Sequence, residues 1–204
     1  MSRYNESRVR ELYAAGNYSS GVGSTMDATA EVRAQLPAIC AEFGIKTLLD
    51  CPCGDMAWMR QVNLAGVAYT GADIMEELVR RHLRAFPGRM FFGFNAITDA
   101  LPRAYDLILC RDFLFHISNA DIERVLANFR ASGSRYLLTT TWDLPGRTPD
   151  LAGPQAEIGW GFRRIAVCDF GLAAAVASFR ESAPVCRGRW MELHEINPSE
   201  RSQP

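Results

Sequence analysis

The stretch Leu48-Leu49-Asp50-Cys51-Pro52-Cys53-Gly54-Asp55 is the most informative in the chain. A short apolar run ends in an acid, turns at Pro52 and Gly54, and leads into a predicted helical turn beginning near Met56. This order is typical of a buried strand followed by a loop against a ligand, at the place where open α/β sheets bind nucleotides. The stretch therefore predicts an α/β fold with a nucleotide-type ligand at the end of the first strand.

The composition of this loop argues against a diphosphate ligand. Pyrophosphate-binding loops use several glycines, and some add a lysine, whereas this loop has one glycine, no lysine, and acids at Asp50 and Asp55. Carboxylates repel phosphates but attract a ligand that carries an ammonium and a sulfonium group. We therefore expect S-adenosylmethionine (SAM) as the ligand.

Length and charge limit the alternatives. A chain of 204 residues fits one domain. Its net charge of −1, from 22 basic and 23 acidic residues, gives no overall field that would attract nucleic acid or a membrane. No apolar stretch predicts a membrane span or a signal core. The six cysteines are scattered, and Cys51-x-Cys53 is too short for the usual zinc clip. We expect a cytoplasmic protein with reduced thiols.

Strand and helix patterns alternate along most of the chain, as a parallel sheet with crossover helices requires. Strands are predicted at 47–51, 67–74, 89–95, 105–110 and 135–141. Helices are predicted at 5–15, 27–43, 56–62, 76–86 and 119–132. Residues 143–161 contain three prolines and four glycines and predict a long functional loop. A helix within 165–177 and two last strands, 177–182 and 189–196, complete the predicted order.

Five ordered motifs also carry a resemblance to a known family. They are Ser20-Gly21-Val22-Gly23-Ser24, Leu49 to Asp55, Tyr69 to Ile74, Cys110 to Ser118, and Leu137 to Thr141. Over nearly its whole length the chain resembles the class I SAM-dependent methyltransferases, and among them small bacterial enzymes of polysaccharide or capsule synthesis. Its size and composition are also similar to mycobacterial sugar 1-O-methyltransferases of methylmannose polysaccharide synthesis. Pro52 and Met56 depart from the family's glycine pattern.

The resemblance implies a Rossmann-like sheet of five parallel strands plus a C-terminal antiparallel pair, with helices on both faces. It implies a single domain over 1–204, with a cap or lid at 1–27, a cofactor-binding core at 45–141, an acceptor-side loop at 142–164 and a tail at 196–204. The implied activity is methyl transfer from SAM to a hydroxyl of a carbohydrate, such as the 1-OH of a methylated mannoside, or of another small molecule. S-adenosylhomocysteine (SAH) would be the second product.

The residues expected at the cofactor lie mainly at strand ends. Asp73 closes the second strand 23 residues after Asp50, near the spacing at which an acid meets ribose hydroxyls. Ile74 would pack on adenine or in the core, and Asn95 would accept from the adenine amino group or serve as a turn residue. The loop before Ser24 would close over the methionine end or act as a linker. The full expected set is Gly23, Ser24, Asp50, Cys51, Gly54, Asp73, Ile74, Asn95, Ala96 and Arg111.

The chemistry is expected after the fourth strand, where Arg111 and Asp112 lead to His116. A base that takes the acceptor's proton contributes about 10²–10⁴-fold. Asp112 and His116 are four residues apart, so one helical turn would place them on one face, where the carboxylate could fix the imidazole tautomer. The alternative is a structural histidine in an apolar turn. His82, among arginines, predicts a solvated position, and His194 an edge or surface position.

The acceptor side is less specific. Trp142 and Trp160 would stack on a sugar ring or cover the core, and Arg163 would meet an anionic acceptor or lie in solvent. The metal requirement stays open, with Asp112, Asp143 or Asp169 as candidate Mg²⁺ ligands, and a homodimer stays open as well.

Two other functions remain. One is methyl transfer to an amine, a nucleic acid or a protein, and the other is a non-catalytic cofactor-binding module. Enzymes that methylate base amino groups usually carry [DN]-P-P-[YF] after the fourth strand, whereas this chain has Cys-Arg-Asp-Phe at 110–113. Because the chain also has no basic extension, we expect a small-molecule or oligosaccharide acceptor and no nucleic acid partner.

Overall fold

The computed structural model describes residues 7, 10–11 and 19–197. The helix predicted at 5–15, the first part of the predicted lid, and most of the predicted tail lie outside these residues. None of the helices within them has the length and apolarity needed to cross a bilayer.

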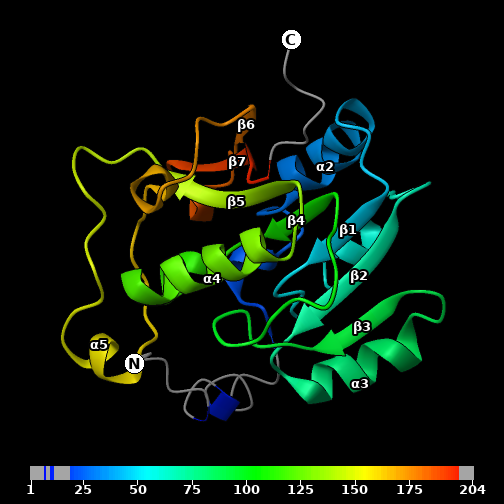
Figure 1. Ribbon diagram of the computed structural model, residues 1–204, viewed down its shortest axis with the longest axis horizontal. Coiled ribbons are helices and arrows are strands. Elements are labelled where there is room, and N and C mark those ends of the chain that lie inside the picture. Colours follow the sequence, from blue (N-terminus) through cyan, green and yellow to red (C-terminus); the bar gives the residue numbers. More distant parts are fainter. Residues whose placement is uncertain (1–6, 8–9, 12–18, 198–204) are drawn as a thin grey trace.

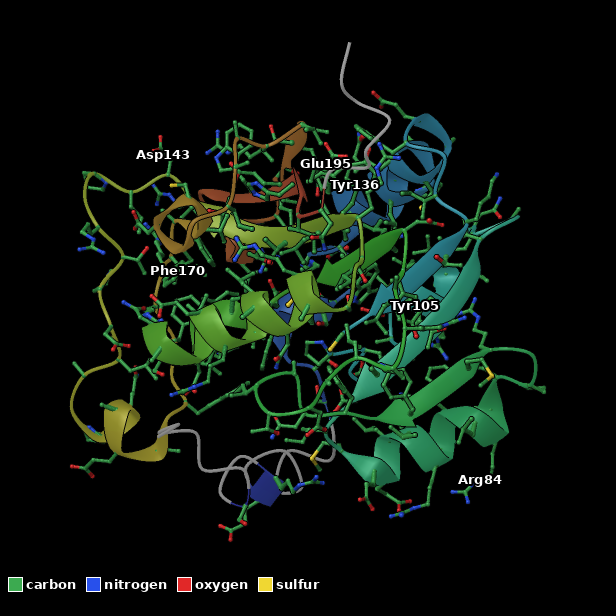
Figure 2. The ribbon with its side chains drawn as sticks, viewed as in Figure 1. Arg84, Tyr105, Tyr136, Asp143, Phe170 and Glu195 are labelled. Atoms are coloured by element: carbon green, nitrogen blue, oxygen red, sulfur yellow. The ribbon has the colours of Figure 1, made fainter. Side chains whose placement is uncertain are left out.

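Within the described residues, seven strands form one sheet in the order β3-β2-β1-β4-β5-β7-β6. They are β1 (Thr47–Asp50), β2 (Ala68–Asp73), β3 (Met90–Gly93), β4 (Leu107–Cys110), β5 (Tyr136–Trp142), β6 (Ala177–Arg180) and β7 (Arg189–Glu195). The first five run parallel, whereas β7 is antiparallel to both β5 and β6. Tyr136 at the start of β5 pairs with Glu195 at the end of β7 (Figure 2). The predicted sheet is therefore confirmed.

Helices cover both faces of this sheet. They are α2 (Ala30–Glu42), α3 (Glu76–Ala85), α4 (Asn119–Ala131) and the short α5 (Pro154–Ile158). Figure 1 shows α4 across the near face. Leu49 and Ile108 pack in the same core cluster as the apolar side of α4, whereas Leu48 and Leu107 pack with α2. Neighbouring strand residues thus alternate between two cores, as a doubly covered sheet requires.

Three predicted helical segments differ in the structure. The helix predicted at 56–62 is only a 3-10 turn, η2 (Met59–Gln61), because Met56 has a left-handed backbone, with φ 61°. The segment 165–177 also forms one 3-10 turn, η4 (Val167–Phe170), which ends at Gly171 with φ 71°. The helix predicted at 27–43 begins at Ala30 and ends at Glu42. Helix propensity alone does not locate the ends of these helices, because the surrounding fold determines where each helix begins.

The carboxyl ends of the parallel strands meet at one edge of the sheet. In Figure 1 the arrowheads of β2, β4 and β5 point to the left of the view, where the segment that carries α5 also lies. Open α/β sheets bind ligands at this edge.

Candidate functional site

A first cavity lies where the ends of β1, β2 and β4 meet the loops that follow them. It is lined by Ser20, Ser24, Asp50, Pro52, Cys53, Gly54, Trp58, Asp73, Ile74, Met75, Arg111, Asp112, Phe113 and Trp160. The structure therefore brings together six of the expected cofactor residues: Ser24, Asp50, Gly54, Asp73, Ile74 and Arg111. We call this space the cofactor cavity.

Asp73 holds the loop that follows β1. Its two carboxylate oxygens accept hydrogen bonds from the backbone N–H groups of Gly54, at 3.0 Å, and Met75, at 2.9 Å. Burial raises the pKa of Asp73, while these two N–H groups oppose that shift. Gly54 has φ 54°, and a Cβ there would lie 2.3 Å from Oγ of Ser20. A glycine is therefore required where this loop approaches the neighbouring segment.

Asp50 forms an acidic part of the cavity wall. Its side chain is almost fully buried and accepts a hydrogen bond from the Tyr69 hydroxyl at 2.8 Å. Burial raises the pKa of Asp50 to about 7, and the Tyr69 hydrogen bond limits that rise. A cationic group placed beside this carboxyl would stabilise its ionised form.

The segment around η1 (Val22–Ser24) is tied to the cofactor loop. Ser20 and Asp55 exchange two hydrogen bonds: the Ser20 N–H donates to Asp55 Oδ2 at 3.0 Å, and the Asp55 N–H donates to Ser20 Oγ at 2.9 Å. Asp55 also accepts from the Ala57 N–H at 3.0 Å. Asp55, the second acid of this loop, does not line the cofactor cavity, and its two oxygens accept hydrogen bonds from these local N–H groups.

A buried ionic network lies beside the cofactor cavity. Arg111 pairs with Glu181 at 2.8 Å and with Asp112 at 3.1 Å, and it donates to the Gly23 carbonyl at 2.9 Å. Arg189 pairs with both oxygens of Asp112, at 2.9 and 3.0 Å, and with Glu181. Arg111 thus fixes the η1 segment and Asp112 together.

His116 has a different partner from the expected one. Its Nδ1 lies 2.5 Å from the carbonyl oxygen of Gly161, and its ring stacks on Trp160 with centroids 4.6 Å apart and planes 12° apart. Because a carbonyl only accepts, Nδ1 carries the hydrogen and Nε2 has the free lone pair. The helical turn expected to join His116 with Asp112 is wrong, because Asp112 has φ 55° and only Leu114–His116 form a 3-10 turn.

The environment of His116 favours the neutral imidazole. Burial lowers its pKa below the ordinary histidine value, and the Gly161 carbonyl and the Asp112 charge oppose that shift. A backbone carbonyl, rather than the expected carboxylate, therefore fixes the tautomer. The resulting Nε2 is suited to accept a proton near neutral pH.

A second cavity adjoins the first, and we call it the acceptor cavity. Its volume is about 340 Å³. It is lined by Ser19, Ser20, Gly21, Val22, Gly23, Asp112, Phe115, His116, Trp160, Phe162, Val185 and Arg189. Ser20, Asp112 and Trp160 line both cavities and form the boundary between them. The two cavities therefore share a wall.

Two expected acceptor residues serve the fold instead. Trp142 is buried in the core at the end of β5, and its ring meets the Phe115 ring edge to face with centroids 5.2 Å apart. Arg163 is buried and donates to the carbonyl oxygens of Pro149, Phe115 and Ile117. Trp160 alone of the three expected acceptor residues lines the acceptor cavity.

Four expected cofactor residues do not line the cofactor cavity. Cys51 is buried in the core, and Gly23 lines the acceptor cavity, where a Cβ would lie 2.6 Å from Asp112 Oδ2. The side-chain oxygen of Asn95 accepts from the Ile97 N–H at 3.0 Å, which is the turn role. The Ala96 carbonyl accepts from Asn128 of α4.

The other two histidines are buried, which corrects both predictions for them. His82 in α3 is 2% exposed, and its Nε2 lies 2.7 Å from the Gly54 carbonyl oxygen. His194 in β7 is also buried, with Nδ1 2.7 Å from the Ala173 carbonyl oxygen. His82 therefore contacts the backbone of the loop that follows β1 and does not face solvent.

Three apolar members of the cofactor cavity were missed by sequence reasoning: Trp58, Met75 and Phe113. Each follows within a few residues of a strand-end motif, but its pattern does not differ from that of a core residue. The guanidinium carbon of Arg111 lies 5.6 Å from the centre of the Trp58 ring.

The candidate metal ligands are not grouped. No cluster of three His, Cys, Asp or Glu side chains suited to a metal occurs among the described residues. Asp169 accepts from the Thr148 N–H at 2.6 Å. Asp143 lines a separate cavity on the β5–β7 side. In Figure 2 it lies far from Arg84, which marks the α3 end of the molecule.

The arrangement can be compared with known proteins. No protein-family model and no curated protein sequence matches this chain. Among solved structures, the N-methyltransferase NodS from Bradyrhizobium japonicum, in complex with SAH, aligns with a TM-score of 0.66 at 12% identity, over 96% of this chain and 100% of that one. The chain has the class I methyltransferase fold.

Two further structures have this fold. The 1,6-didemethyltoxoflavin-N1-methyltransferase of Burkholderia thailandensis, with SAH bound, has a TM-score of 0.67 and 16% identity, over 95% of this chain and 87% of that one. The magnesium protoporphyrin IX methyltransferase ChlM of Synechocystis, with bound SAH, has a TM-score of 0.61 and 17% identity, over 94% and 100%. At these identities the similarity establishes the class I methyltransferase fold.

Proposed function

We propose that the protein binds SAM in the cofactor cavity and transfers its methyl group to an oxygen of a small molecule in the acceptor cavity. The observation that carries this proposal is the boundary between the cavities. Asp112 and Trp160 belong to both walls, and His116, with its tautomer fixed, lies on the acceptor side of that boundary.

The cofactor cavity fits SAM chemically. Asp73 stands at the end of β2, where an acid accepts from ribose hydroxyls in this type of sheet. Asp50 supplies a buried carboxyl group for a cationic group of the ligand, and Trp58 and Phe113 supply apolar surface for the base. The neighbours NodS and ChlM were crystallised with SAH. When bound, SAM supplies a methyl group whose bond to sulfur breaks, with the electron pair going to sulfur, as the bond to the acceptor oxygen forms.

The residues of this chain would move the proton. The acceptor hydroxyl loses its proton to Nε2 of His116. This nitrogen is unprotonated because the single ring hydrogen of the neutral imidazole is on Nδ1, where it is donated to the Gly161 carbonyl. Asp112, fixed by Arg111 and Arg189, places a negative charge near the imidazolium that forms. Such general-base assistance contributes about 10²–10⁴-fold to the rate.

We propose only that the acceptor hydroxyl belongs to a small molecule. A carbohydrate hydroxyl, such as the 1-OH of a methylated mannoside, follows from the sequence resemblance, and Trp160 is the expected carbohydrate-stacking residue that lines the acceptor cavity. An amine acceptor is the alternative, since the solved structures with this fold include N-methyltransferases by their names.

Methyl transfer can be measured with SAM carrying a labelled methyl group and a panel of hydroxyl and amine acceptors. We expect label in an O-methyl product, identified by mass spectrometry, with one SAH formed per methyl transferred. The His116→Asn variant should bind SAM but lose transfer. Label found only in an N-methyl product, with hydroxyl acceptors unmodified, would overturn the proposal.

A further inference from the structure

We propose that the acceptor is an uncharged, planar aromatic compound with a hydroxyl group on the ring. This inference rests on the proposed function and defines its substrate class. It follows from four features of the acceptor cavity: its aromatic wall, its apolar rim, its paired charges and its serine hydroxyls that already accept hydrogen bonds.

The inner wall of the acceptor cavity is a packed group of rings. His116 and Trp160 are stacked, and the Phe115 and Phe162 rings meet edge to face with centroids 5.2 Å apart. His116 and Phe162 also meet edge to face, at 6.2 Å. Ring pairs at these distances stabilise one another beyond the area that they bury. The rings therefore hold one another in place and present a preformed aromatic surface to the acceptor.

The rim of the cavity is apolar and exposed. Val22 is 71% exposed, Phe162 60% and Val185 51%, and all three line this cavity. They are three of the seven large apolar side chains that are exposed among the described residues. Scattered exposed apolar residues need no explanation, but a group of them around a cavity indicates a site for an apolar ligand.

The charged side chains of this wall are paired with one another. Asp112 and Arg189 form two contacts at 2.9 and 3.0 Å, and Arg189 also pairs with Glu181. An anionic acceptor would have to compete with two carboxylates for Arg189. A carboxylate or phosphate on the acceptor is therefore disfavoured.

Each serine hydroxyl of the wall already accepts one hydrogen bond from the chain, which reduces its capacity to bind a ligand hydroxyl. Ser19 Oγ accepts from the Gly21 N–H at 3.2 Å, and Ser20 Oγ accepts from the Asp55 N–H at 2.9 Å. A sugar needs partners for several ring hydroxyls, because each one buried without a hydrogen bond costs free energy. A ring hydroxyl on an aromatic compound needs one partner, and Nε2 of His116 provides it.

Acidity and size agree with this assignment. A phenol has a pKa of about 10, the value of the tyrosine side chain, so a single neutral imidazole can take its proton more readily than that of an alcohol. The volume of about 340 Å³ lies at the lower end of the range for small-molecule sites, and it suits one to three fused rings rather than an oligosaccharide. The proton passes to Nε2, and the products are an aryl methyl ether and SAH.

The experiment uses the full chain and first measures SAM binding by calorimetry. Lack of SAM binding would remove the proposed function itself. Labelled methyl transfer is then compared within two matched pairs: 2-naphthol against trans-2-decalol, and the methyl ester of 3-(4-hydroxyphenyl)propionate against its free acid. Methyl α-mannoside is the carbohydrate arm.

We expect kcat/KM for 2-naphthol to exceed that for decalol and for the mannoside by about 100-fold or more, and that for the ester to exceed that for the acid by about 10-fold. A protein that binds SAM but prefers the mannoside or decalol would overturn the inference and leave the proposed function standing. Failure of 2-naphthol to quench tryptophan fluorescence of the SAH-loaded protein would overturn it too.

A pair of variants tests the surface directly. Phe162→Ser removes an exposed ring of the acceptor cavity, whereas Leu83→Ser removes a comparably exposed apolar side chain from α3, outside both cavities. We expect Phe162→Ser to raise KM for 2-naphthol about 10-fold with SAM affinity unchanged, and Leu83→Ser to leave KM unchanged. Equal KM values in the two variants would contradict an aromatic binding role for this rim.

Discussion

His116 and Gly161 hold each other through two hydrogen bonds. Nδ1 of His116 lies 2.5 Å from the Gly161 carbonyl oxygen, and the Gly161 N–H donates to the His116 carbonyl oxygen at 2.8 Å. The segment after α5 therefore fixes both the backbone and the ring of the proposed base. An imidazole held in this way keeps one protonation pattern, with Nε2 free to accept.

Replacing His116 by Asn separates this structural role from catalysis. The Asn side-chain amide can still donate to the Gly161 carbonyl, but it has no counterpart of Nε2. We expect kcat for an aromatic hydroxyl acceptor to fall about 10²–10⁴-fold, with the Kd for SAM and the Tm close to wild type. Single-turnover transfer and calorimetry would measure this, and an unchanged kcat would exclude His116 as the base.

The pH dependence of the rate provides a second test. Because burial lowers the pKa of His116, the imidazole is already unprotonated at neutral pH. We expect kcat at saturating SAM to rise with pH through a pKa below the ordinary histidine value of about 6.5 and to be level above it. A midpoint at pH 7 or higher would mean that another group titrates.

Asp50 should couple SAM binding to pH. In the free protein its pKa is raised to about 7 by burial. A cationic ligand binds the ionised form, so the affinity for SAM should rise about 10- to 20-fold between pH 5.5 and pH 7.0, where the ligand's α-amino group stays protonated. Asp50→Asn should flatten this dependence. Calorimetry in buffers with different ionisation enthalpies would detect the released proton, and identical pH profiles for the two proteins would contradict the role.

The same group should affect the stability of the ligand-free protein. The folded-state pKa of Asp50 lies above the unfolded value, so the carboxyl group favours folding at low pH and loses that contribution as the pH rises from 3.8 to about 7. We expect Asp50→Asn to raise Tm relative to wild type at pH 8, and to do so less at pH 5. The opposite order would show that Asp50 is ionised in the folded protein throughout.

A comparison of two glycines distinguishes the effect of backbone strain from the effect of a close contact. Gly54 and Gly66 both have positive φ, but a Cβ at Gly54 would lie 2.3 Å from Ser20 Oγ, whereas a Cβ at Gly66 has no neighbour within 4 Å. Alanine at either position costs about 1–2 kcal/mol in backbone strain. Gly54→Ala should also weaken SAM binding about 10-fold or more. If both variants bind SAM like wild type, the cofactor loop does not need the contact with Ser20.

Sequence reasoning predicted the sheet because strand alternation and strand-end acids are local signals. Asp50, Gly54 and Asp73 were expected at one cavity, and the structure places them there. The position of His82 could have been predicted as well. Leu78, Val79 and His82 share one helix face, whereas the neighbouring Arg80 and Arg84 are exposed on the other side of α3. The charged residues on either side of His82 made this helical spacing of buried residues hard to recognise in the sequence.

Other features depend on contacts that no local pattern contains. Three acceptors of Arg163 are the carbonyl oxygens of Pro149, Phe115 and Ile117, which only the fold brings together. Trp142 is buried because β5 is covered on both faces, and all seven residues of this strand are buried. Gly161, 45 residues after His116, became its partner through the path of the loop that carries α5.

Binding of SAM to the purified protein tests the central claim most directly. Titration calorimetry at pH 7 should give one site per chain for SAM and for SAH. Asp73→Ala, which leaves the N–H groups of Gly54 and Met75 without their acceptor, should weaken both about 10-fold or more. Uptake of NAD or ATP in the absence of any heat from SAM or SAH would contradict the account.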